Sequence, residues 1–238
     1  MKRDTLGTQV VELFDEKAPS WGEKYDVSGS LRDRLLRFVV ALRERKPPPA
    51  NIFELGCGTG DLAGALNAQG YAVTAADVSQ RMLDQAKVRF GHEKIRWHEL
   101  PTGWRSLPLA TASVDAVLAS SVLEYVPDVP VVLAECARVL APGGVFLATV
   151  PNPAHWIRKV EGLFSVDWVG TAMGPLTARV PKLRNYRRYL EVSRNRWPPE
   201  QWQLLLREAG LSPEPQLESR GPLTLLGAVR GRTSVGST

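Results

Sequence analysis

Cysteine is scarce in this sequence, which argues against both a disulfide framework and a cysteine-bound metal site. The 238 residues include only two cysteines, Cys57 and Cys136, which lie far apart. They lack the paired spacing of a zinc or redox site, so the pattern supports neither a disulfide framework nor a metal cluster. We therefore expect two free thiols and no bound metal.

Long apolar runs are also missing. No run approaches the ~20 residues that a helix needs to span a bilayer. The first residues, MKRDTLGTQVVELF, lack the apolar block and the small-residue cleavage site of a secretory signal. We therefore expect a cytoplasmic chain without a membrane span. Because 44% of the residues are hydrophobic and 23% are charged, the chain can bury a full core as a single domain.

Acidic residues are nearly absent from one stretch near the C-terminal end. The formal net charge is +5, and Glu191 is the one acid between residues 179 and 196. The basic residues of this stretch are Arg179, Lys182, Arg184, Arg187, Arg188, Arg194 and Arg196. Such a cluster fits an acidic substrate, a nucleic acid or a solvated helix face, and the sequence leaves the three open.

Helix and strand signals alternate through the middle of the chain. Strands are predicted at 51–56, 71–77, 114–120 and 145–150, and helices at 61–70, 79–91 and 129–140. This alternation is typical of a mostly parallel sheet with helices on both faces. We therefore predict a doubly wound α/β fold with a seven-stranded sheet whose last strand is antiparallel.

The remaining segments divide the single domain, residues 1–238, into four parts. An N-terminal helical flap is expected over 1–46, because an amphipathic helix at 31–45 ends at KPPP. The core follows at 47–150, and a cap rich in proline, tryptophan and arginine is inserted at 151–197. A helix and closing strands are predicted over 198–230, with the strands near 214–218 and 223–230 linked by a hairpin-like turn.

Three glycines, Gly56, Gly58 and Gly60, stand where the first strand hands over to a helix. Glycine allows a sharp turn that brings the backbone against a ligand, and the next helix offers N–H groups and a positive dipole end. The G-x-G-x-G spacing departs from the G-x-G-x-x-G of dinucleotide folds and weighs against a pyrophosphate cofactor. About 20 residues further on, Asp77 ends the second strand, where an acid binds the ribose hydroxyls of a nucleoside.

Four motifs in order resemble those of class I S-adenosylmethionine-dependent methyltransferases, particularly the small-molecule branch of ubiquinone and menaquinone biosynthesis. They are ELGCGTG, AADVSQRML, SVDAVLASSVLEYVPD and RVLAPGGVFLATVPNP, and they cover roughly residues 50–150. The resemblance implies a Rossmann-like methyltransferase fold with S-adenosylmethionine as cofactor.

The resemblance also implies which residues contact the cofactor, position by position. Asp77 would hold the ribose hydroxyls, and Ser120 and Ser121 would line the amino-acid end. The full set is Glu54, Gly56, Cys57, Gly58, Gly60, Asp77, Val78, Met82, Glu99, Leu100, Ser120 and Ser121. The family often has Glu-His where this chain has Glu124-Tyr125, so no histidine acts at that place.

Two residues are candidate catalytic groups. Methyl transfer from a sulfonium chiefly requires in-line alignment and exclusion of water. His155 follows the fifth strand, at the edge where open parallel sheets bind ligands, and could take a proton from a hydroxyl; the alternative is a histidine that touches no ligand. Tyr25 belongs with Phe14 and Trp21 to a segment that could close over the cofactor and dry the site.

The aromatic content of the cap suits a lid over an apolar or aromatic acceptor. Its large side chains are Trp156, Phe164, Trp168, Met173, Tyr186, Tyr189 and Trp197. We predict methyl transfer to an oxygen, carbon or nitrogen of a phenolic, quinone-like or natural-product molecule. A nucleic-acid methyltransferase using the basic stretch is the alternative, although no Asn-Pro-Pro-Tyr-like motif follows the fourth strand. An oxidoreductase and a non-catalytic nucleoside-binding protein are further rivals, and the glycine spacing disfavours the first.

Overall fold

The computed structural model describes residues 2–29, 31–164, 181–215 and 218–231. Within these ranges the strands are β1 Asn51–Leu55, β2 Ala72–Asp77, β3 Arg96–Glu99, β4 Val114–Ser120, β5 Leu140–Pro151, β6 Leu211–Pro213, β7 Glu218–Arg220 and β8 Leu223–Arg230. The helices are α1 Lys2–Trp21, η1 Gly22–Tyr25, α2 Arg32–Arg45, α3 Asp61–Asn67, α4 Gln80–Phe90, α5 Val129–Val139, α6 Trp156–Phe164, α9 Pro181–Val192 and α10 Pro199–Glu208.

The strands form one sheet in the order β3-β2-β1-β4-β5-β8-β6, and the short β7 pairs with β8. β1 to β5 pair in parallel, whereas β8 is antiparallel to both β5 and β6. The predicted doubly wound fold, with seven strands in one row and an antiparallel last strand, is confirmed. In place of one strand at 214–218 there are two short strands, β6 and β7, and both pair antiparallel with β8. β6 begins early, because Gly210 at φ 80° follows the preceding helix and Leu211 enters the core directly. β7 and β8 are joined at Gly221 and Pro222, where the hairpin-like turn is predicted.

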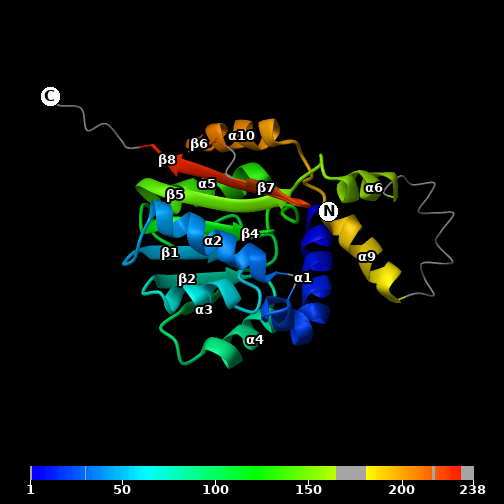
Figure 1. Ribbon diagram of the computed structural model, residues 1–238, viewed down its shortest axis with the longest axis horizontal. Helices are drawn as coiled ribbons and strands as arrows, with labels where there is room; N and C mark the ends of the chain where they lie inside the picture. Colours follow the sequence, from blue (N-terminus) through cyan, green and yellow to red (C-terminus); the bar gives the residue numbers. More distant parts are fainter. Residues whose placement is uncertain (1, 30, 165–180, 216–217, 232–238) are drawn as a thin grey trace.

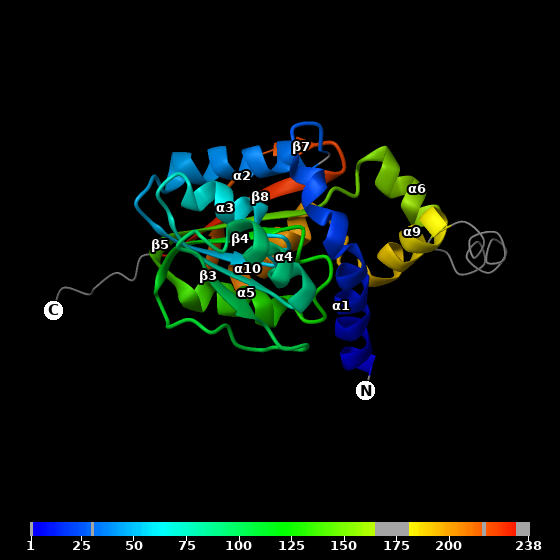
Figure 2. The same ribbon diagram turned by 90° about the horizontal axis from the view of Figure 1, so that it is seen from below.

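Helices cover both faces of the sheet, as the two views of the ribbon show (Figures 1 and 2). In β4, Val117 and Ala119 pack in the core beneath α5 and α10, while Ala116 and Leu118 pack beneath α2 and α3. All four side chains are fully buried. Burial on both faces explains why the parallel strands read as continuous apolar runs rather than as alternating ones.

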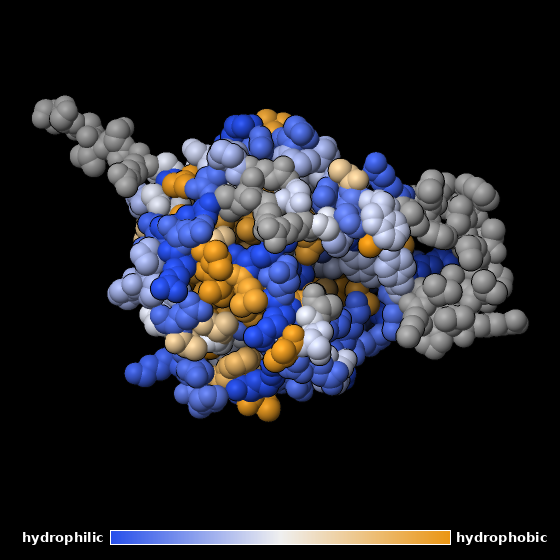
Figure 3. Space-filling model, in the orientation of Figure 1, coloured by the Kyte–Doolittle hydropathy of each residue, from blue (hydrophilic) through white to orange (hydrophobic). Residues whose placement is uncertain are grey.

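The N-terminal segment serves two different purposes. α2, which lies in the predicted flap, packs on the sheet with Phe38 and Leu42 fully buried, and it belongs to the helical layer. Figure 3 shows apolar surface over this helix, where Leu36 and Val40 are exposed. α1, in contrast, lies across the carboxyl ends of the strands beside α9 (Figure 1). α1 and η1 therefore cover the strand ends, and α2 reaches them only near its first turn, through Arg34.

α1 packs against the described part of the cap through an apolar cluster. Leu6, Val10 and Leu13 of α1 are buried with Val192 of α9, and Tyr189 packs against the same cluster. Trp168, Met173 and Arg179, which the sequence placed in the cap, lie outside the described residues, as does the side chain of Phe164. Among the helices that the structure describes, none has the length and apolar character needed to cross a membrane.

Candidate functional site

A cavity of about 530 Å³ opens at the carboxyl ends of the parallel strands, beneath α1. Its walls include residues that follow β1, β2 and β4, together with Phe14 and Trp21 of α1. The strand order reverses between β1 and β4, and this switch point is where open α/β sheets bind ligands. The strand order therefore determines where the cavity lies, independently of individual side chains.

The glycine bend after β1 is held against β2 by its own backbone. The N–H groups of Gly56 and Cys57 both donate to the carbonyl oxygen of Ala76, at 2.7 and 3.0 Å. Gly56, at φ 70°, has no space for a side chain, because a Cβ there would lie 2.3 Å from Cγ2 of Val122. At Gly56 the wall of the cavity is therefore formed by backbone atoms without a side chain.

Asp77 ends β2 and touches this bend. Its Oδ2 accepts a hydrogen bond from the Gly58 N–H at 2.8 Å, and its Oδ1 accepts one from the Ser79 N–H at 2.9 Å. Burial raises the pKa of Asp77, and these N–H donors act in the opposite direction. Since a carboxylate offers about four acceptor positions, both oxygens keep capacity for a ligand hydroxyl.

Glu54 brings a second buried carboxyl group to the cavity wall. It is 2% exposed, and its Oε2 has no hydrogen-bond partner within the part of the chain that the structure describes. Burial, with the nearby charges of Asp61 and Asp77, raises its pKa well above the ordinary value. A buried acceptor without a partner is unfavourable, and a donor on a ligand or a water molecule would satisfy it.

Glu54→Gln is expected to stabilise the fold at neutral pH by about 1–2 kcal/mol, while weakening ligand binding. Because the pKa of Glu54 is raised in the folded state, its neutral carboxyl group contributes fully to stability below the unfolded-state pKa of 4.5. This contribution is lost as the pH rises through the folded-state pKa. An amide cannot ionise, so the variant should lose this pH dependence. Urea unfolding at a series of pH values measures it.

Glu135→Gln is the matched control, and we expect its change in stability to have the opposite sign. Hydrogen bonds from Arg138 lower the pKa of Glu135, so its ionised form stabilises the protein above the unfolded pKa. This variant should lose stability at neutral pH. If Glu54→Gln lost stability in the same way, Glu54 would have a partner that satisfies its charge.

Arg34 supplies a positive charge to the wall of the cavity. Its Nη1 donates to Ser121 Oγ at 2.8 Å, and its Nη2 donates to Tyr25 Oη at 3.2 Å. Its Nε is buried without a partner among the described residues. The sequence pattern missed this residue because the arginines of an amphipathic helix are expected to face solvent.

α1 is held over the cavity by two consecutive acids, Asp15 and Glu16, which contact different helices. Ser79 Oγ donates to Asp15 Oδ1 at 2.5 Å. Since Ser79 is the N-cap residue of α4, this contact joins α1 to the start of α4 near Asp77. Arg188 Nη1 lies 2.6 Å from Glu16 Oε2, which ties α1 to α9. The helix thus joins the Asp77 side of the cavity to the inserted cap.

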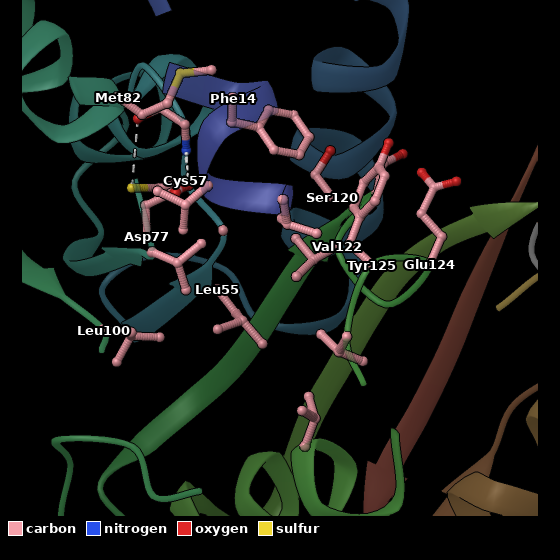
Figure 4. Close-up of a pocket in the computed structure, with 18 of the residues that line it drawn as sticks. Phe14, Leu55, Cys57, Asp77, Met82, Leu100, Ser120, Val122, Glu124 and Tyr125 are labelled. Atoms are coloured by element: carbon pink, nitrogen blue, oxygen red, sulfur yellow. Dashed lines mark hydrogen bonds between the residues drawn. The ribbon is translucent and has the colours of Figure 1, made fainter. Parts of the chain in front are cut away.

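The far end of the cavity combines aromatic rings with a buried carboxyl group. Figure 4 shows Phe14, Tyr125 and Glu124 grouped at one end of the pocket, away from Asp77, Met82 and Leu100. Tyr189 and Arg158, from the cap, line the same cavity. The cavity is therefore long enough to have two ends of different chemistry.

Most of the predicted site residues come together here. The predicted residues that line the cavity are Glu54, Gly56, Cys57, Gly58, Asp77, Val78, Met82, Leu100, Ser120, Ser121 and Tyr25. Gly60 and Glu99 do not line it. Gly60 is needed for packing, since a Cβ there would lie 2.7 Å from the Trp97 ring, and Glu99 is exposed at the end of β3.

His155 is also absent from the described lining of the cavity, contrary to expectation. Its backbone N–H donates to the Asn152 carbonyl oxygen at 3.1 Å, in a turn that leads into α6. There its Nδ1 accepts a long hydrogen bond from the Ile157 N–H at 3.4 Å, and its ring lies beside Trp156. His155 sits at the start of a helix, and we assign it no catalytic role.

The described arginines of the basic stretch are largely ion-paired. Arg187 pairs with Glu191, Arg188 with Glu16, and Arg196 with the buried Glu161 at 3.0 Å. These three described arginines are therefore compensated by acids; the pair of Arg188 connects the cap to α1, and the pair of Arg196 joins it to Glu161 of α6.

Comparison with known proteins agrees with the motifs and the topology. A family model described as a methyltransferase domain matches residues 53–148. The ubiquinone/menaquinone biosynthesis C-methyltransferase UbiE of Desulfotalea psychrophila is 35% identical over 150 residues, covering 61% of this chain and 60% of that protein. The malonyl-[acyl-carrier protein] O-methyltransferase of Serratia marcescens is 32% identical over 145 residues, covering 60% of this chain and 53% of that protein.

A solved structure extends the likeness of the fold beyond the matched domain. The 1,6-didemethyltoxoflavin-N1-methyltransferase of Burkholderia thailandensis, with bound 1,6-didemethyltoxoflavin and S-adenosylhomocysteine, has a TM-score of 0.63 at 18% identity. The match covers 92% of this chain and 87% of that one, and at this identity it shows the fold alone.

Residues 53–148 match a methyltransferase domain, in agreement with the motifs that resemble class I S-adenosylmethionine-dependent methyltransferases. Within that class the chain resembles the ubiquinone and menaquinone methyltransferases. The alignments span less than two thirds of the length of the two curated relatives.

Proposed function

We propose that this protein transfers a methyl group from S-adenosylmethionine to a small molecule. The observation that carries the proposal is the hydrogen bond from the Gly58 N–H to Asp77 at 2.8 Å. It joins the glycine bend to an acid at the end of β2, next to the switch point, where nucleoside-binding folds hold the ribose. A cavity of about 530 Å³ beside it has room for more than one ligand group.

The residues present fit S-adenosylmethionine group by group. Asp77 would accept hydrogen bonds from the ribose hydroxyls, and Val78, Met82 and Leu100 would enclose the adenine. The partnerless Oε2 of Glu54 would accept from the ammonium group of the methionine.

Arg34 would hold the carboxylate of the methionine, beside Ser120 and Ser121. Its buried Nε lacks a partner among the described residues, so an anionic ligand group would satisfy it. The two unsatisfied groups, Glu54 and Arg34, have opposite charges, as the ends of an amino acid require.

When bound, S-adenosylmethionine supplies a methyl group on a positively charged sulfur. The protein's own contribution is alignment of the acceptor and exclusion of water. Phe14, Trp21 and Tyr25 line the cavity from the N-terminal segment and would keep water out. Burial raises the pKa of Tyr25, so we propose that it acts as a hydrogen-bonding wall rather than as a base.

Calorimetry with S-adenosylhomocysteine and with NAD⁺ tests cofactor binding, and label transfer tests the reaction. We expect binding of S-adenosylhomocysteine and none of NAD⁺. The protein is then incubated with methyl-labelled S-adenosylmethionine and a panel of phenols, quinones, amines and total RNA, and we expect label in a small molecule. Label in RNA would support the nucleic-acid alternative, and binding of NAD⁺ alone would overturn the proposal.

A further inference from the structure

Methyl transfer to a neutral hydroxyl group releases a proton, and a group in the cavity must receive it. We call the end of the cavity that Phe14, Tyr125 and Glu124 line the acceptor end. In the reaction of a hydroxyl group, the oxygen forms a bond to the methyl carbon, and the carbon–sulfur bond breaks with its electrons going to sulfur. The hydroxyl proton then leaves to a base. This inference rests on the proposed function and concerns which residue is that base.

Glu124 is the buried carboxyl group at the acceptor end. Glu54 and Asp77 belong to the end assigned to the cofactor, and Asp128, which also lines the cavity, caps α5. Glu124 is 2% exposed and lines the cavity beside Tyr125 (Figure 4). It is therefore placed to meet an acceptor hydroxyl that approaches the methyl group.

The cap holds the Glu124 side chain in place. Its Oε2 accepts a hydrogen bond from Ser193 Oγ at 2.7 Å and a longer one from Tyr189 Oη at 3.4 Å. Its backbone carbonyl oxygen accepts from the N–H groups of Arg194 and Asn195, at 2.9 and 3.2 Å. A carboxylate fixed at both its backbone and its side chain meets the geometric demand on a general base.

The charges around Glu124 set its basicity in two opposing ways. Burial raises its pKa, whereas the Ser193 hydrogen bond and the charges of Arg158, Arg196 and Arg34 lower it. Glu161 is buried between Arg158 and Arg196 and pairs with both, at 2.8 and 3.0 Å, which limits their effect on Glu124.

Lys17 and two tyrosines complete the charged and titratable surroundings of Glu124. Lys17 lies behind the Phe14 and Tyr189 rings, and burial lowers its pKa to about 8. Burial raises the pKa values of Tyr125 and Tyr189, so neither ring hydroxyl takes up a proton from the acceptor. Among these groups, the carboxylate is the one suited to receive it.

Aromatic rings beside Glu124 indicate the shape of the acceptor. Phe14 and Tyr125 pack edge to face with centroids 5.2 Å apart, and Tyr125 and Tyr189 do so at 6.3 Å. All three side chains line the cavity. Aromatic walls of this kind favour an acceptor with a planar ring, because the three side chains offer both ring edges and ring faces for packing.

We propose that Glu124 is the general base of the reaction and that the acceptor is a hydroxyl-bearing aromatic ring methylated on oxygen. The hydroxyl proton passes to a carboxylate oxygen of Glu124 as the oxygen–methyl bond forms. Arg158 donates to Tyr189 Oη at 2.7 Å and thereby positions the tyrosine beside this carboxylate. After the ether product leaves, the proton returns to water.

Two acceptors of different acidity test the role of Glu124 in the full chain. Phenol is un-ionised at neutral pH and needs a base, whereas pentafluorophenol is ionised and needs none. For Glu124→Gln we expect a turnover with phenol about 10²-fold lower, little change with pentafluorophenol, and unchanged affinity for S-adenosylhomocysteine. The rise in rate with pH that reports ionisation of the base should also disappear.

Ser193→Ala is the matched variant, because it removes a hydrogen bond from the same carboxylate and keeps the base. Loss of a donor to the ionised form raises the pKa of Glu124, so the rise in rate should move to higher pH rather than vanish. If Glu124→Gln slowed both phenols equally, or left phenol unaffected, Glu124 would not be the base.

Two further outcomes separate this inference from the proposed function. If the wild-type protein binds S-adenosylhomocysteine but labels neither phenol, the acceptor class is wrong and the inference fails while the cofactor assignment stands. If it binds neither S-adenosylhomocysteine nor S-adenosylmethionine, the proposed function itself fails.

Discussion

Gly56→Ala is expected to lower the free energy of unfolding by about 2–4 kcal/mol. Gly56 has φ 70°, where a residue with a Cβ is strained. The new methyl group would also lie 2.3 Å from Cγ2 of Val122, so the loop after β4 must move. Since Val122 lines the cavity, this movement should weaken binding of S-adenosylhomocysteine as well.

Two control variants separate backbone strain from steric overlap. Gly210 has φ 80° and no atom within 4 Å of an added Cβ, so Gly210→Ala should show the strain alone, about 1–2 kcal/mol. Adding Val122→Ala to Gly56→Ala should restore part of the loss beyond the cost of Val122→Ala itself. Urea unfolding measures all of these variants. A Gly56→Ala protein no less stable than Gly210→Ala would show that the bend is not crowded.

Asp77→Ala is expected to weaken binding of S-adenosylhomocysteine by roughly 1.5–3 kcal/mol, because charge-assisted hydrogen bonds to the ribose are lost. The carboxylate also holds the Gly58 N–H, so the glycine bend loses a partner. Calorimetry at neutral pH gives the affinity.

Asp61→Asn is the matched control for Asp77. Asp61 is a buried acid at the start of α3, pairs with Arg89 at 2.7 Å, and lies outside the described lining of this cavity. Its substitution should reduce stability and change the affinity much less than Asp77→Ala does, because Asp61 acts on the site only through the pKa values of Glu54 and Tyr25. Equal losses of affinity in both variants would mean that Asp77 acts by supporting the loop and not by touching the ligand.

The residues that we assign to the cofactor could be placed at one edge of the sheet from the sequence, because each lies at or just after the end of a strand. The glycine bend and Asp77 occupy fixed positions at the ends of successive strands, and parallel pairing brings such ends to one edge. Strand periodicity and turn chemistry are local, so a linear pattern is enough to place them. The same reasoning located Ser120 and Ser121 at the end of β4.

The acceptor end could not be predicted in this way. His155 follows a strand, as an active-site residue should, yet a turn and the start of α6 direct it elsewhere. Arg34 sits in a helix whose arginines resemble solvent-facing charges, yet it reaches Ser121, 87 residues away in the sequence. Glu124 and Ser193 are 69 residues apart, and only folding of the cap brings them to 2.7 Å.

By itself, the sequence determined the alternation of strands and helices, the glycine bend and the acid at the end of β2, because each depends on neighbouring residues. The tertiary structure decided which of the described charges are paired, that His155 lies outside the described lining of the cavity, and which buried carboxyl group lies among the aromatic side chains. Those properties depend on burial and on contacts between distant segments, and a linear pattern contains neither.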